Sequence, residues 1–178
     1  LSYLKKQTLG IVKKYKVLDH HSCHAYYALY GLKFQSSAKQ AVITMDSWGD
    51  GRNQTFWIKE KNKELKLISS SNQCQVARIY KFTTLILSMK PDEHEYKVMG
   101  MAPYSKFEYA NEVYEKVYKN ILSVKNCKVI HKNKPKNLYE HLEKNLKNYR
   151  FDNIAGGLQI FVEKILSELF NQIYKKYK

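Results

Sequence analysis

Residues 40–51 read QAVITMDSWGDG, and this stretch determines the fold that we expect for the chain. Its first seven residues are mostly apolar or β-branched and end on an acidic residue, which predicts a buried strand over Gln40–Asp46. A glycine-containing turn follows at Ser47–Gly51, and further strands are predicted at Thr55–Lys59 and Leu65–Ser69. The pattern therefore favours a small meander of strands in an α/β domain.

Three histidines within five residues precede the meander, in the motif HHSCHA at residues 20–25. A helix is predicted over residues 22–32, and side chains four apart at the start of a helix lie on one face. His20 and His24 can therefore share a metal ion, if a third ligand, commonly a carboxylate, comes from elsewhere. That set suits iron(II) or another divalent ion. The alternative is a pair of histidines that binds no metal, at the surface or in the core.

The spacing of the two histidines resembles that of the zinc-protease helix. In that helix a catalytic glutamate follows the first histidine, whereas position 21 of this chain is histidine. The chain is therefore not expected to be a metalloprotease.

The second half of the chain is predicted to be helical, because apolar positions recur there at helical spacing. Helices are expected over residues 76–89, 96–101, 108–122, 138–149 and 154–177, with a loop over residues 132–137. The longest helix carries an apolar face made of Leu158, Phe161, Ile165, Leu169 and Ile173. Three short strands cannot cover so many apolar helix faces, so we expect the chain to be a piece of a larger domain.

The composition limits the partners and the location of the protein. Its net charge is +15, but only three of the 31 basic residues are arginine, the residue that reads bases and phosphates bidentately. The lysines are also spread along the chain, so a nucleic-acid partner is not expected. No apolar run approaches the roughly 20 residues that cross a bilayer, and neither a signal peptide nor a disulfide framework is predicted. We expect a cytoplasmic protein with no membrane partner.

Two further motifs could meet a phosphate. Asp46 ends a strand, and Gly49 and Asp50 follow in the turn, which would let the backbone approach a phosphate while a carboxylate holds its metal. An ordinary Asp-Gly hairpin is the alternative. The later stretch EYKVMGMAPY, residues 95–104, offers Lys97 and Gly100 on a short helix that could face an anionic ligand, or simply a packed turn.

The three motifs in this order resemble the NodU/CmcH family of carbamoyltransferases. The resemblance extends from about Val17 to Tyr174 and includes IAGGLQ at residues 154–159, with Glu163 after it. It implies that residues 1–178 are one partial amino-terminal domain of that family. The implied fold is actin-like, as in acetate and sugar kinases, heat-shock proteins and actin, with a small mixed sheet and several helices. The family's YrdC-like carboxy-terminal domain is absent from the chain.

The resemblance also implies a reaction. The YrdC-like domain makes carbamoyl-adenylate from carbamoyl phosphate and ATP, and the actin-like domain passes the carbamoyl group to an acceptor hydroxyl of a small molecule, such as a sugar or natural product. The chain would be inactive without the missing remainder of the enzyme. Two alternatives stay open: a non-catalytic actin-like module that binds nucleotide or metal, and a binder related to tRNA modification.

Site residues follow from the resemblance position by position. His20 and His24 match the metal ligands, and a third ligand, an aspartate, is expected beyond Lys178. The residues matched to the loop near the adenylate phosphate and its metal are Asp46, Gly49 and Asp50. Those matched to the acceptor and nucleotide cleft are Lys97 and Gly100. The chain departs from the family pattern where glycine is usual, at Ser47, Tyr96 and Ser105.

Overall fold

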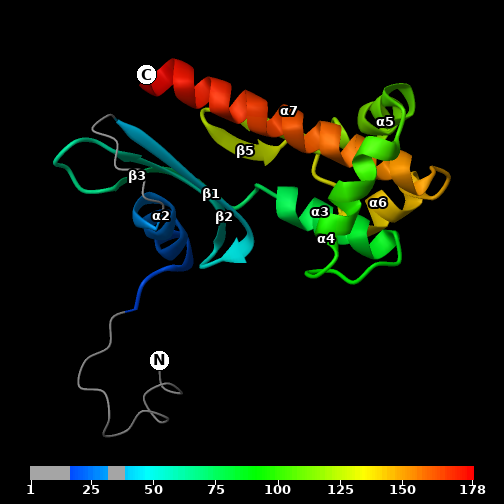
Figure 1. Ribbon diagram of the computed structural model, residues 1–178, viewed down its shortest axis with the longest axis horizontal. Coiled ribbons are helices and arrows are strands. Elements are labelled where there is room, and N and C mark those ends of the chain that lie inside the picture. The colour runs from blue at the N-terminus through cyan, green and yellow to red at the C-terminus, as the bar shows by residue number, and fades with distance from the viewer. Residues whose placement is uncertain (1–16, 32–38) are drawn as a thin grey trace, which may run out of the picture.

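A three-stranded antiparallel sheet forms the centre of the first half of the protein. The computed structural model describes residues 17–31 and 39–178 (Figure 1). The strands β1 (Gln40–Gly49), β2 (Arg52–Lys59) and β3 (Lys66–Ser71) pair in the order β1-β2-β3. The three predicted strands are therefore confirmed, with β1 extended to Gly49.

The hairpin between β1 and β2 turns on Asp50 and Gly51, whose φ angles are +49° and +78°. Positive φ at both central residues is what a tight two-residue hairpin requires, and Asp-Gly is a favoured pair for it. Before the turn the pairing is irregular: Met45 pairs with Gln54, and the next pair is Gly49 with Arg52. Such a bulge bends the strand and redirects its side chains, and Asp46 lies at its start.

The helix α2 (His20–Tyr30) covers one face of this sheet, and Figure 1 shows it beside the strands. Ala25 and Leu29 pack there in one apolar cluster with Val42, Trp57 and Leu65. The helix was predicted to start at Ser22 but starts at His20, because the Asp19 side chain accepts a hydrogen bond from the Ser22 backbone N–H at 3.0 Å and caps it. The three histidines thus lie within the helix.

The opposite face of the sheet packs against the carboxy-terminal helices and forms with them a second, larger apolar cluster. Phe56 and Ile58 of β2 are buried in this second cluster, whereas Trp57 between them faces α2. The Phe56 ring packs edge-on against Tyr177, at the end of the longest helix, with ring centroids 5.1 Å apart. The sheet is therefore covered on both faces.

The second half is helical, as predicted, and the remaining helices gather around the longest one (Figure 1). They are α3 (Val76–Ile86), α4 (Glu95–Met101), a 3₁₀ turn (Ala102–Tyr104), α5 (Phe107–Val113), a π-helical turn (Tyr114–Tyr118), α6 (Leu138–Leu146) and α7 (Phe151–Tyr177). All five residues of the predicted apolar face of α7 are buried. No helix in the described ranges 17–31 and 39–178 is long and apolar enough to cross a membrane.

A second hairpin replaces the end of one predicted helix. The sequence predicted a helix over 108–122, but the chain passes through the π-helical turn into β4 (Leu122–Lys125) and β5 (Lys128–His131). Asn126 and Cys127 have positive φ angles, +54° and +60°, and form its two-residue turn. Both sheets of the described residues are antiparallel, so the expected mixed sheet is not found among them.

The start of α7 carries a buried carboxylate that makes folding sensitive to pH. Asp152 is 2% exposed and accepts two hydrogen bonds from the Arg150 guanidinium, at 2.8 and 2.9 Å. These bonds, opposed by burial and aided by the Arg150 charge, lower the pKa of Asp152. A lowered pKa in the folded state stabilises the fold above the unfolded pKa, about 3.9, and this contribution is lost as the pH falls through the folded pKa.

We therefore expect Asp152→Asn to lower the free energy of unfolding by about 1 kcal/mol at neutral pH, because Arg150 is itself largely exposed. The difference from the wild type should shrink at about pH 3, because this lies below the unfolded pKa of about 3.9 and the unfolded chain then binds the proton. Urea unfolding at the two pH values measures both quantities. Asp92→Asn, which removes an exposed carboxylate paired with Lys81, is the control and should cost less. If Asp152→Asn lowered the free energy of unfolding equally at both pH values, the ion pair with Arg150 would not be the cause of the loss.

Candidate metal centre

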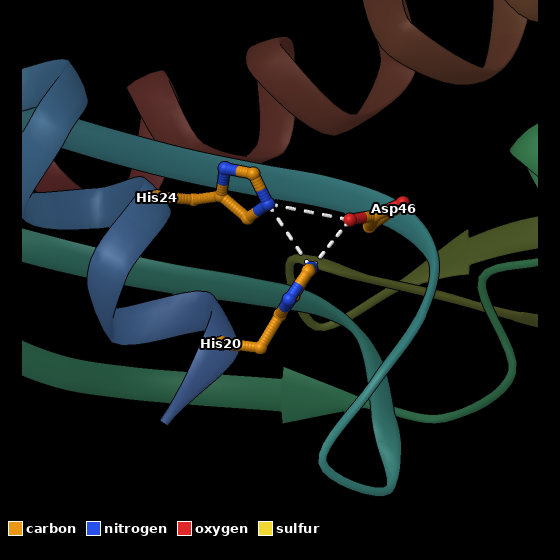
Figure 2. A group of neighbouring side chains, drawn as sticks. All are labelled: His20, His24 and Asp46. Carbon is orange, nitrogen blue, oxygen red and sulfur yellow. Dashed lines mark hydrogen bonds and ion pairs between the residues drawn. The ribbon is translucent and has the colours of Figure 1, made fainter. Parts of the chain in front are cut away.

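His20, His24 and Asp46 bring three donor atoms to one point between α2 and the end of β1 (Figure 2). The His20 Nε2 and Asp46 Oδ2 atoms are 2.5 Å apart, and the His24 Nε2 atom lies 3.3 Å from the same oxygen. The two Nε2 atoms are 3.0 Å from each other. The predicted pairing of the two histidines on one helix face is therefore confirmed, and a carboxylate joins them.

Two sides of the triangle, 3.0 and 3.3 Å, have the length expected between neighbouring ligands of one ion, and the third, between His20 and Asp46 at 2.5 Å, has the length of a hydrogen bond. Nitrogen and oxygen ligands lie about 2.0–2.2 Å from a divalent transition metal, so neighbouring ligands of one ion are roughly 3.0–3.4 Å apart. Two imidazoles and one carboxylate form the donor set that non-haem iron(II) uses when it keeps positions open for other ligands. The three side chains are between 35% and 53% exposed, so solvent or a substrate can reach an ion bound there. The residues present fit a divalent metal.

Two carboxylates fix the first turn of α2, which carries His20 and is followed in the next turn by His24. Asp19 caps the helix, and Asp50 accepts a hydrogen bond from the His20 backbone N–H at 2.6 Å. Carboxylates at a helix amino terminus satisfy its free N–H groups and interact favourably with its dipole. Asp50, which the sequence predicted to lie near a phosphate, thus joins the β1–β2 turn to the start of α2.

Gly49 leaves the space that the His20 ring occupies. A Cβ atom at position 49 would lie 2.2 Å from the His20 Cδ2 atom and 2.5 Å from its Cγ atom. No side chain can be accommodated at these distances unless the ring moves. The glycine predicted to serve a phosphate loop therefore has a steric role next to His20.

Asp46 is held in its charged form. Burial acts to raise the pKa of its carboxyl, but hydrogen bonds from His20 and from the Ser47 backbone N–H, at 2.5 and 2.6 Å, outweigh that effect and lower the pKa. An anionic oxygen beside two imidazoles is the form that binds a cation. The sequence predicted Asp46 near a metal, but it located the third ligand beyond Lys178. Sequence reasoning missed that β1 ends beside the first turn of α2.

A cleft of about 400 Å³ begins at Asp46 and connects two of the three motifs. Its wall is formed by Asp46, Ser47, Ala77, Tyr80, Lys81, Asp92, Glu95 and Met99. Glu95 and Met99 belong to the EYKVMGMAPY stretch, so this motif does lie near the metal-binding candidates. Lys97 and Gly100, its predicted binding residues, are exposed on α4 and are not among the wall residues. The Lys97 ammonium instead lies 5.9 Å from the centre of the Tyr96 ring.

Tyr80 is a partly buried polar residue of this wall. Its hydroxyl donates a hydrogen bond to Gln159 at 2.8 Å, and the Gln159 amide donates in turn to Glu163 at 2.9 Å. Burial and the nearby Glu163 charge raise the pKa of Tyr80 to about 12, so the hydroxyl keeps its proton. The residues Gln159 and Glu163, noted in the sequence, thus hold the Tyr80 side chain of the cleft wall by hydrogen bonds.

A larger cavity, of about 780 Å³, lies between α7 and β4 and is lined by residues such as Tyr114, Lys119 and Lys164. None of the three candidate metal ligands lines it. We assign the site to the smaller cleft because Asp46 is part of its wall.

Comparison with known proteins gives a family and three relatives. The family described as Carbamoyltransferase N-terminus matches residues 2–178. Two uncharacterized proteins of Methanocaldococcus jannaschii are similar: MJ1058, 27% identical over 98% of this chain and 31% of its own length, and MJ1051, 32% identical over 68% of this chain and 24% of its own length. An uncharacterized Synechocystis protein, sll1178, is 26% identical over 60% of this chain and 16% of its own length. The chain thus spans less than a third of the length of these curated relatives.

Proposed function

Because this chain belongs to the family of carbamoyltransferase amino-terminal domains, we propose that it holds the acceptor site of an O-carbamoyltransferase of the NodU/CmcH type. In this proposal the carbamoyl group comes from carbamoyl phosphate through an ATP-dependent carbamoyl-adenylate. It passes to a hydroxyl group of a small molecule such as a sugar or natural product. The domain would be completed to an actin-like fold by the rest of the protein, which would also carry the adenylate-forming half.

The arrangement that carries this proposal is the set of His20, His24 and Asp46 at the edge of a cleft. A divalent ion held by these three side chains, iron(II) in our proposal, would polarise a carbonyl or phosphate oxygen. Asp46 contributes the negative charge, and Asp50 and Gly49 keep the helix and the His20 ring in position. The ion pair between Lys81 and Asp92, together with Glu95, gives the cleft hydrogen-bonding groups suited to a polyhydroxylated acceptor.

Phosphate recognition is the second part of the proposal. Asp50 and Gly49 lie in the turn after β1, and Lys97 and Gly100 lie exposed on α4. We propose that these residues face the adenylate when the remainder of the enzyme is in place. We further propose a cytoplasmic enzyme, in keeping with the free thiols of Cys23, Cys74 and Cys127.

The reaction class can be tested with the full-length protein that contains this chain. We expect ATP to be converted to AMP and pyrophosphate only when carbamoyl phosphate is present, and labelled carbamoyl phosphate to label an added hydroxyl compound. Omitting carbamoyl phosphate is the control. Pyrophosphate release that is independent of carbamoyl phosphate, or its absence under all conditions, would contradict the proposal.

A non-catalytic module that binds nucleotide or metal is the second candidate. It is favoured by the residues Ser47, Tyr96 and Ser105, which replace glycines usual in the family. The Ser105 hydroxyl donates a hydrogen bond to Asn153 Oδ1 at 2.7 Å, so this position now serves to attach the turn after α4 to α7. Nucleotide binding by the full-length protein without any carbamoyl transfer would support this candidate.

A further inference from the structure

His21, which directly follows the metal-ligand candidate His20 in α2, is completely buried. Its side chain lies between α2 and the sheet, where its Nδ1 atom is 2.6 Å from the hydroxyl oxygen of Thr44 on β1. Thr44 is itself 6% exposed. The His21 Nε2 atom is buried with no hydrogen-bond partner among the described residues, so the Thr44 contact is the hydrogen bond that offsets the cost of burying the ring.

The contact is the first link of a buried chain of hydrogen bonds. The hydroxyl oxygens of Thr44 and Thr55 are 2.5 Å apart, and the Trp57 indole N–H donates to the Thr55 hydroxyl at 2.6 Å. An indole N–H can only donate, so the Thr55 oxygen acts as its acceptor. All four side chains are buried, and in such surroundings hydrogen bonds are strong and reinforce one another.

This chain of hydrogen bonds joins the same two segments, α2 and β1, as the candidate metal centre does. His21 follows His20 directly, and Thr44 precedes Asp46 by two residues on β1. The same two segments are therefore joined twice, once by the buried pair His21–Thr44 and once by the partly buried pair His20–Asp46. The buried link uses no donor atom of the candidate metal centre, so it can fix the spacing of the two segments independently of that centre.

We propose that His21 is a positioning residue, which sets the separation of His20 and His24 from Asp46 through Thr44, Thr55 and Trp57. The proposal rests on the metal centre of the proposed function. His21 is not itself a member of the donor set, whose ligand atoms lie within 4.8 Å of one another. Its ring centroid is 6.5 Å from that of His24. In this proposal the chain of hydrogen bonds controls metal affinity as well as stability.

Thr44→Val in the full-length protein is the main test, because it removes one hydroxyl and nearly preserves shape. With cobalt(II) as the probe, titrated by its visible absorption, we expect binding roughly 10- to 100-fold weaker than in the wild type, as for other residues that orient metal ligands. The cobalt spectrum should change as well. His21→Leu should behave in the same way, and His21→Asn, whose amide can still bond to Thr44, should recover part of the affinity.

Thr83→Val is the matched control. Thr83 of α3 is as deeply buried, and its hydroxyl is hydrogen-bonded to the Tyr118 hydroxyl at 3.2 Å rather than to a residue of α2. The same substitution there should lower the melting temperature without changing cobalt affinity or spectrum. If Thr44→Val fails to fold, Thr55→Val replaces it, because Thr55 is the next residue in the chain of hydrogen bonds.

Cobalt binding by all folded variants at the wild-type affinity would overturn the positioning role and leave the metal centre intact. If the wild type itself binds no cobalt, the proposed metal centre fails. The positioning role is then judged without metal, from the ¹⁵N chemical shifts of the His20 ring in wild type and Thr44→Val. A change in those shifts supports it, because the contact between His20 and Asp46 is then altered, and unchanged shifts overturn it.

Discussion

Replacing Asp46 by asparagine in the full-length protein should lower metal affinity by more than about 100-fold. Residues that merely orient metal ligands already account for roughly 10- to 100-fold, and Asp46 would be a ligand itself. The substitution removes the negative charge beside two imidazoles and leaves an amide oxygen in its place. His20→Ala and His24→Ala should have effects of the same order, because each removes one corner of the triangle. Titration with iron(II) or cobalt(II) under anaerobic conditions measures the affinities.

Two substitutions serve as controls for these effects. Asp92→Asn removes an exposed carboxylate from the same cleft, and His141→Ala removes a histidine of α6. Both should bind metal as the wild type does. Carbamoyl transfer should be lost in the Asp46, His20 and His24 variants together with the metal. Wild-type metal affinity in Asp46→Asn would show that the third ligand comes from another part of the protein.

Much of this site could be predicted from local sequence. Helical spacing alone places His20 and His24 on one face, and the apolar run before Asp46 identifies β1. Both predictions depend on neighbours within a few residues, where backbone geometry determines the direction of side chains.

The features that were missed depend on contacts between segments far apart in the chain. Asp46 meets the histidines only because α2 packs across β1, 22 to 26 residues away, and no local pattern encodes that contact. The β4–β5 hairpin was missed for another reason: its strands are four residues long, and the apolar positions before it continue a helical pattern. Only the positive φ angles at Asn126 and Cys127 show where the chain turns.

Gly49→Ala is expected to disable the metal centre without touching a ligand. The φ angle of Gly49 is not among the positive ones, so alanine can adopt this backbone conformation. The new methyl group would nevertheless lie 2.2 Å from the His20 ring, so the ring must leave the position in which it contacts Asp46. We expect metal affinity to fall at least roughly 10-fold, as when a ligand loses its orientation, and the free energy of unfolding to fall by about 1–3 kcal/mol.

Gly156→Ala separates these two effects, because it introduces the same methyl group into another crowded place, away from the metal centre. There the added Cβ atom would lie 2.7 Å from the Ala110 side chain, where α5 packs against α7, far along the chain from the histidines. This variant should lose comparable stability and keep its metal affinity. If Gly49→Ala lost only stability, the ring of His20 would have room to move and still reach the metal. The glycine would then be required by the turn or by a phosphate, as the sequence suggested, rather than by His20.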